Sequence, residues 1–177
     1  MPPAIEPVAT RAPLTDLEQE GLDYRRRYQG LIGIGSKVPI RDRAILSLVY
    51  TPGVAEACLA IAEDPLASFD LTCRGNTVAI LTDGSDIFGR ESGPPEAAIP
   101  LEEAKSVIFK TFAGVDAFPL SLATPDPDRI VETGLALSST FGAICLDDIS
   151  APRAFTIADN LETVSYTHLT LPTTPYV

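Results

Sequence analysis

Three short apolar runs, separated by stretches with helical signals, constrain the fold more than any other feature of the chain. The first helical stretch lies between the first two runs and extends from Pro100 to Phe112, and the second, DPDRIVETGLALSST, lies between the last two. Strands that alternate with helices are typical of a parallel sheet. We therefore expect an α/β fold, a three-layer parallel sheet with flanking helices. The runs are NTVAILTDG, DAFPLSL and FGAICL.

Capping residues mark further helices upstream. The spacing of Thr15 and Glu18 is that of a capping box, which predicts a helix from there to about Tyr28. Thr51 and Pro52 suit the N-cap and the first position of another helix, VAEACLAIAE. The segment GLIGIGSKVPIRDR between these helices is expected to be an extended loop, and its Gly-Ile-Gly lacks the context of a dinucleotide-binding turn.

Charge and composition exclude several classes of partner. Among 177 residues, 13 are basic and 24 acidic, and the net charge of −11 disfavours binding to nucleic acid or to an anionic membrane. The three cysteines lack metal-ligand spacing and are expected to be small buried residues. No apolar run approaches the length needed to cross a bilayer, and no signal peptide is evident, so a cytoplasmic protein is expected.

The two ends of the chain differ from its middle. Residues 1–13 are rich in proline and alanine and are expected to be a disordered leader, followed by one domain over residues 14–163. Residues 164–177, VSYTHLTLPTTPYV, have almost no charge, and their first ten back-translate to what looks like a transposon-type sequencing adapter. We expect this tail to be non-native, although a genuine disordered tail is the alternative. The only histidine, His168, lies in it, so no histidine-based mechanism is expected.

Lys105 is a candidate base. In the helix that begins near Pro100, it shares a face with Leu101, Phe109 and Phe112. A lysine among apolar side chains loses hydration, so its pKa falls and it can accept a proton near neutral pH. The alternative is a side chain that passes the phenylalanines and holds its ammonium in water.

Two further signals lie at the ends of elements. Tyr50 immediately precedes a helix N-terminus, where backbone N–H groups favour an anion. Asp147 and Asp148 follow the third strand, at the edge where α/β sheets usually bind ligands. Paired carboxylates suit a divalent cation, but a helix cap is the other interpretation. Because successive strand residues face opposite ways, both can reach one ion only if the chain turns there.

Taken together, five segments resemble the N-terminal domain of bacterial malic enzymes. The resemblance extends over roughly residues 22–162. It is carried by YTPGVAEACLAIAEDP, VAILTDG, EEAKSVIFKTFAGVDAFPLSL, TPDPDRIVETGLAL and FGAICLDDISAPRAF.

The resemblance implies an activity and roles for these residues. Malic enzymes oxidise malate with NAD or NADP, and the oxaloacetate formed loses carbon dioxide to give pyruvate. Tyr50 would be the general acid, Lys105 the general base, and Asp147 with Asp148 would bind magnesium or manganese. Members of the family form dimers or larger assemblies, so a homo-oligomer is expected, with no nucleic-acid or membrane partner.

The chain also departs from the family pattern. Asp147 stands where the family has glutamate, and the loop G-L-G-N-I-G-P is replaced by residues 89–95, in which Glu91 and Pro94 take two glycine positions. Arg90 in this loop could bind a carboxylate of malate. We expect the substrate and metal half of the enzyme, without its cofactor-binding domain and inactive alone. The alternative is a non-catalytic carboxylate-binding or regulatory module.

Overall fold

The computed structural model describes residues 13–87, 90–91, 93–164 and 168–170, and the chain divides into two compact units, Met1–Leu31 and Ile32–Val177. In the first unit, helix α1 extends over Asp16–Tyr28. The capping box is present, because Glu18 N donates to Thr15 Oγ1 over 3.3 Å and Thr15 N donates to a Glu18 carboxylate oxygen over 2.7 Å. The helix predicted from Thr15 to Tyr28 is confirmed, whereas the leader lies almost wholly outside the described residues.

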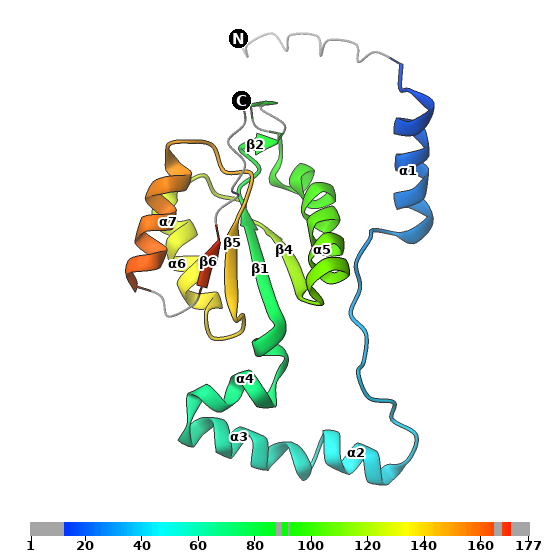
Figure 1. Ribbon diagram of the computed structural model, residues 1–177, viewed down its shortest axis with the longest axis vertical. Coiled ribbons are helices and arrows are strands. Elements are labelled where there is room, and N and C mark those ends of the chain that lie inside the picture. Colours follow the sequence, from blue (N-terminus) through cyan, green and yellow to red (C-terminus); the bar gives the residue numbers. More distant parts are fainter. Residues whose placement is uncertain (1–12, 88–89, 92, 165–167, 171–177) are drawn as a thin grey trace, which may run out of the picture. The chain divides into compact units, whose positions relative to one another are not determined.

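A parallel sheet forms the centre of the second unit (Figure 1). Its strands run in the order β4-β1-β5-β6, and every pair is parallel. The three predicted strands are therefore confirmed. The fourth, β6, lies in the segment 164–177 that the sequence sets apart, and the origin of that segment stays a prediction. The strands are β1 Thr77–Thr82, β4 Asp116–Ser121, β5 Ala143–Leu146 and β6 His168–Thr170.

Helices cover both faces of the sheet. Helix α5, Ile99–Ala113, lies against one face, and helices α6, Pro127–Leu137, and α7, Arg153–Val164, lie together against the other (Figure 1). Alternate strand residues divide between the two cores, as the pleat requires. Leu81 and Ile144 pack with Ile157 of α7, whereas Ile80 packs towards α5. This confirms the α/β fold with its three layers.

Several short elements precede β1 along the chain. The N-cap of α3 is Pro52, without a side-chain hydrogen bond, so the prediction of Thr51 as N-cap was wrong. Helix α2 was not predicted; it begins after Asp42, whose carboxylate accepts a hydrogen bond from Ile45 N over 2.9 Å. The elements are α2 Arg43–Val49, α3 Gly53–Glu63, η1 Pro65–Ala67, α4 Ser68–Leu71 and η2 Cys73–Asn76.

The α2–α3 segment also corrects two expectations from composition. Residues Arg43–Glu63 are long and apolar enough, by length and composition, to cross a membrane, contrary to the expectation that no run is. The structure divides this stretch into two helices at Tyr50, whose φ of −125° and ψ of −129° are not helical. Cys58 in α3 and Cys73 are exposed, so only Cys145 is the small buried residue that was expected.

The remaining elements connect β1 to α5. Strands β2, Asp86–Ile87, and β3, Arg90–Glu91, form an antiparallel pair, and η3, Pro95–Ala98, leads into α5. Pro94 has φ −62° and ψ 146°, which a proline adopts readily. The backbone at this position therefore tolerates the proline that replaces a family glycine.

Candidate functional site

Lys105 and three carboxylates converge at one end of the sheet. Nζ of Lys105 lies 2.5 Å from Oδ2 of Asp147 and 3.3 Å from Oδ2 of Asp148. The same nitrogen lies 3.3 Å from Oε1 of Glu102, one turn earlier in α5. Asp147 and Asp148 directly follow β5, so the cluster lies at the carboxyl ends of the parallel strands, where α/β sheets bind ligands.

The backbone at Asp147 and Asp148 makes the turn that a shared ion requires. Asp147 N donates to Leu81 O over 3.0 Å, which continues the pairing of β5 with β1. Asp148 then has a φ of 48°, in the left-handed region, and its carbonyl accepts a hydrogen bond from Asp86 N over 3.2 Å. Because the chain turns at Asp148, both carboxylates face Lys105 instead of opposite sides of the sheet.

Glu102 is the member of the cluster that the sequence interpretation missed. Its side chain is 0 % exposed, and Oε2 is buried without a hydrogen-bond partner among the described residues. Burial first, and then the nearby carboxylate of Asp148, raise the pKa of Glu102 to about 8. The signal that could have found it is its position three residues before Lys105, on the same side of the helix.

The charge state of Lys105 differs from the expectation. Burial lowers its pKa, but the hydrogen bond to Asp147 and the charges of Glu102, Asp147 and Asp148 outweigh burial, so the pKa of Lys105 is raised. The predicted apolar stripe is also incomplete, because Phe112 is 84 % exposed. The prediction of a lowered pKa was wrong for this arrangement, since the carboxylates come from other parts of the chain and are invisible in the helical pattern.

The cluster has the chemistry of a site for a hard divalent cation. One oxygen from each of the three carboxylates lies within 4.8 Å of the other two. Carboxylate oxygens are the ligands that magnesium and manganese prefer. Glu102 Oε2 is a buried acceptor that no N–H or O–H group of the described chain satisfies. These residues therefore fit the metal that the family resemblance implies.

An ion pair beside the cluster ties the loop after β1 to the start of α7. Arg153 lies 3.0 Å from Oδ2 of the buried Asp83, and the same guanidinium nitrogen donates to Ser150 Oγ over 2.9 Å. Ser150 N donates in turn to Ser85 Oγ over 2.9 Å. Ser150, two residues after Asp148, is thus hydrogen-bonded both to the loop after β1 and to the first residue of α7.

The structure does not bring Tyr50 into this cluster. Tyr50 ends α2 and is 68 % exposed, and no hydrogen bond joins it to Lys105 or to the aspartates within the described part of the chain. Figure 1 shows α2 and α3 beyond the amino end of β1, whereas the cluster lies at the opposite end of that strand. Arg90 lies in β3, and its side chain is outside the described part of the structure.

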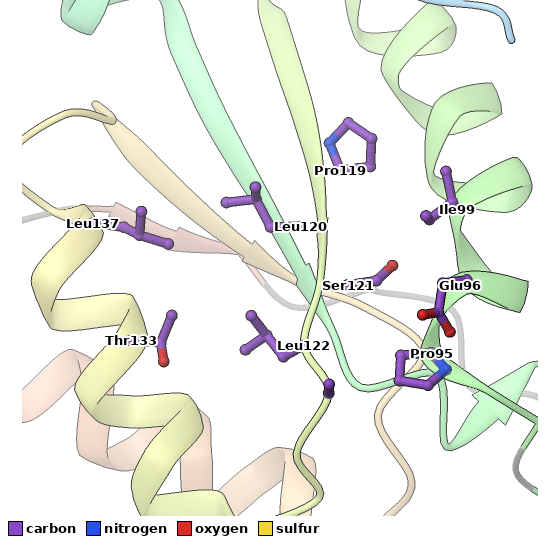
Figure 2. A pocket seen from close by; sticks show the side chains of 10 residues that line it. Pro95, Glu96, Ile99, Pro119, Leu120, Ser121, Leu122, Thr133 and Leu137 are labelled. Carbon is purple, nitrogen blue, oxygen red and sulfur yellow. The ribbon is translucent and has the colours of Figure 1, made fainter.

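A separate hollow of about 420 Å³ lies at the edge of the sheet, across β4 (Figure 2). Glu96 and Ile99 lie on its α5 side, and Thr133 and Leu137 on its α6 side. Its lining is mostly apolar and includes none of the residues of the acidic cluster. The hollow therefore lies beside the edge strand β4 and is separate from the acidic cluster.

A family profile and the solved structures identify the fold and its relatives. The profile of the malic enzyme N-terminal domain matches residues 32–126, more than half of the chain. The chain belongs to the malic enzyme family. An NAD-dependent malic enzyme from Thermotoga maritima has a similar structure, with a TM-score of 0.82 and 39 % identity over 85 % of this chain and 42 % of that one.

Malic enzymes from other bacteria give the same result by sequence. The bifunctional malic/malolactic enzyme of Bacillus subtilis is 48 % identical over 146 residues, which are 82 % of this chain and 36 % of the relative. The NADP-dependent malic enzyme of Escherichia coli is 40 % identical over 82 % of this chain and 19 % of its own length. The chain thus spans about a third or less of the length of these malic enzymes.

Proposed function

We propose that the chain is the substrate- and metal-binding part of an enzyme that oxidises malate and decarboxylates the product to pyruvate and carbon dioxide, with reduction of NAD or NADP. The observation that supports this most is the contact of Lys105 with Asp147 and Asp148 at the carboxyl ends of the strands. These are the residues to which the family resemblance assigns the base and the metal ligands. The proposed enzyme is cytoplasmic, forms a homo-oligomer and has no nucleic-acid or membrane partner.

Asp147 and Asp148 would hold magnesium or manganese. When bound, the cation would polarise the C2 oxygen of malate and stabilise negative charge that develops on it. The turn at Asp148 orients both carboxylates, and the hydrogen bonds from Asp86 N to Asp148 O and from Asp148 N to Asp147 Oδ1 hold that turn. The chain thus supplies two ligands whose positions are fixed before substrate binds.

Lys105 would take the proton of the C2 hydroxyl group as the hydride leaves. It can do so only as the neutral amine, whereas the carboxylates around it favour the ammonium form. Its negative neighbours must therefore be compensated by another cation before Lys105 can act as a base. In this proposal, ion binding and activation of the base are one event at one cluster.

Tyr50 would donate a proton to C3 of the enolate, and Arg90 would bind a carboxylate of malate. The exposure of Tyr50 means that its phenol must move, or become covered in an assembly, before it reaches substrate. Large apolar side chains around it are also exposed, which suits burial in an oligomer. They are Leu46, Leu48, Val49, Val54 and Leu59.

A non-catalytic carboxylate-binding or regulatory module is the second candidate. The observation that favours it is Lys105 itself, which is held as an ammonium by three acidic side chains. A lysine held as an ammonium can bind an anionic ligand through its positive charge, without ever accepting a proton as a base.

The test is malate-dependent formation of NADH or NADPH, with Mn²⁺ present, by a fusion in which the C-terminal part of a malic enzyme relative follows residue 163. We expect the 177-residue chain to bind Mn²⁺ weakly and to form no reduced cofactor, because hydride transfer needs nicotinamide held against C2. The fusion should form it and should lose this activity on Asp148→Asn. Binding of malate and Mn²⁺ without any cofactor reduction would instead establish the non-catalytic module.

A further inference from the structure

We infer that Glu102 is a third carboxylate ligand of the divalent cation, supplied by α5 and not by the strand end that carries the two aspartates. This inference rests on the proposed metal site at Asp147 and Asp148. It adds a residue to which neither the family resemblance nor the sequence pattern gives a role. It also makes the described domain the source of three protein ligands instead of two.

The first argument is the combination of burial and an unsatisfied oxygen. Glu102 is completely buried, and a carboxylate without partners is costly to bury. Oε1 has one contact, at 3.3 Å to Lys105, and Oε2 has no partner in the described part of the chain. A cation at the cluster would give Oε2 of Glu102 the partner that the described residues do not provide.

The second argument is charge. When ionised, the three carboxylates carry three negative charges, and among the described side chains the ammonium of Lys105 is the one positive group in direct contact with all three. Arg153, the other nearby cation, is paired with Asp83. Two negative charges therefore remain uncompensated, and one divalent cation would neutralise them. Without the ion, the described part of the cluster is short of positive charge.

The third argument is distance. Magnesium binds oxygen at about 2.1 Å, so two of its ligand atoms are separated by at most about 4.2 Å. The carboxylate oxygens of Glu102, Asp147 and Asp148 lie within 4.8 Å of one another. Side-chain rotations that move the carboxylate oxygens by a few tenths of an ångström would bring all three into one coordination sphere.

A purely structural role for Glu102 explains less. If Glu102 served only to pair with Lys105, the closer contact of 2.5 Å from Lys105 to Asp147 would make it unnecessary. Ser106, one turn further along α5, is buried too, but its hydroxyl donates a hydrogen bond to Glu102 O over 2.9 Å. Within the described residues, Glu102 is thus the buried polar side chain of α5 that has an acceptor oxygen without a donor.

The experiment is a titration of the 177-residue chain with Mn²⁺, followed by electron paramagnetic resonance of the free ion. Glu102→Gln keeps the shape of the side chain and removes its charge, so we expect Mn²⁺ affinity to fall about tenfold or more, since affinity follows the number of charged ligands. Glu132→Gln, on the exposed side of α6, is the matched control and should leave the affinity unchanged. Water-proton relaxation should show one additional water on the ion in Glu102→Gln.

The outcomes separate this inference from the proposed function. If Glu102→Gln and the wild type bind Mn²⁺ equally while Asp148→Asn loses it, Glu102 is not a ligand and the two-aspartate site remains. If the wild type itself binds no Mn²⁺, both the inference and the proposed metal site are wrong. A thermal midpoint of Glu102→Gln no lower than that of the wild type, measured without metal, confirms that any loss of binding is local.

Discussion

The ammonium of Lys105 and the carboxylate of Asp147 form the closest contact of the acidic cluster, with 2.5 Å between Nζ and Oδ2. The proposed base and a proposed metal ligand are therefore held by each other before any ion binds. A cation that engages Asp147 must compete with this ion pair and, in doing so, changes the charge around Lys105. The pair would thus couple the occupancy of the proposed metal site to the protonation of the proposed base.

Lysine reactivity should report this coupling. We expect an amine-directed reagent at pH 9 to modify Lys110, which is 58 % exposed, well before Lys105, which is 26 % exposed and held as an ammonium. Asp147→Asn removes the closest negative charge, so it should lower the pKa of Lys105 and increase its labelling severalfold. Peptide mass spectrometry measures both sites, and labelling of Lys110 is the internal control. Equal labelling of Lys105 in the wild type and in the variant would contradict the coupling.

The difference between sequence and structure at this cluster has a simple physical origin. Continuous apolar runs predicted β1 and β5, because a strand buried on both faces needs apolar residues at most positions. The apolar residues of β4 predicted that strand as well, although it lies at the edge of the sheet. Asp147 and Asp148 were found because they follow such a run. Glu102 was missed, and the direction of the pKa shift of Lys105 was wrong, because both depend on the aspartates that follow β5, and Asp148 is 43 residues from Lys105 in sequence. Helical periodicity shows which side chains share a face of one helix, but it does not show which residues from other elements pack against that face.

The protonation of Glu102 should make the stability of the metal-free chain depend on pH. Its pKa rises from 4.5 to about 8 on folding, so the folded state binds the proton more tightly than the unfolded state. This contribution is complete below pH 4.5 and is lost as the pH rises through 8. At about 1.4 kcal/mol per pKa unit, this contribution is on the order of 5 kcal/mol. Lys105, Asp147 and Asp148 face Glu102 and modulate the midpoint.

Urea denaturation at pH 5.5 and at pH 9, with a chelator present, would measure this effect. The free energy of unfolding of the wild type should fall between these two values of pH, and Glu102→Gln, which cannot titrate, should lose most of that fall. Glu132→Gln is the control and should follow the wild type. A fall of the same size in Glu102→Gln would show that other groups cause it.

The ion pair of Arg153 and Asp83 should stabilise the loop that carries the aspartates. Arg153→Ala leaves the buried carboxylate of Asp83 without its cation, and we expect a loss of about 1–3 kcal/mol in the free energy of unfolding. The metal affinity should fall as well, because Ser150 and the turn at Asp148 lose their brace. Arg129→Ala removes an exposed ion pair with Asp126, 3.9 Å away. It should change the free energy of unfolding by no more than a few tenths of a kcal/mol and leave the metal affinity unchanged. An unchanged Mn²⁺ affinity in Arg153→Ala would restrict this ion pair to a role in stability.

Substitution of Tyr50 should separate chemistry from folding. Because the side chain is 68 % exposed, Tyr50→Phe should leave the thermal midpoint of the chain within a degree or two of the wild type. In a fusion of residues 1–163 to the C-terminal part of a malic enzyme relative, the same change should lower malate turnover about a hundredfold or more, as expected when a general acid is removed, with little change in malate binding. Tyr24→Phe in α1 replaces another exposed tyrosine and should leave turnover unaltered. Unchanged turnover in Tyr50→Phe would mean that the phenol acts in packing, and that the proton for the enolate comes from another group.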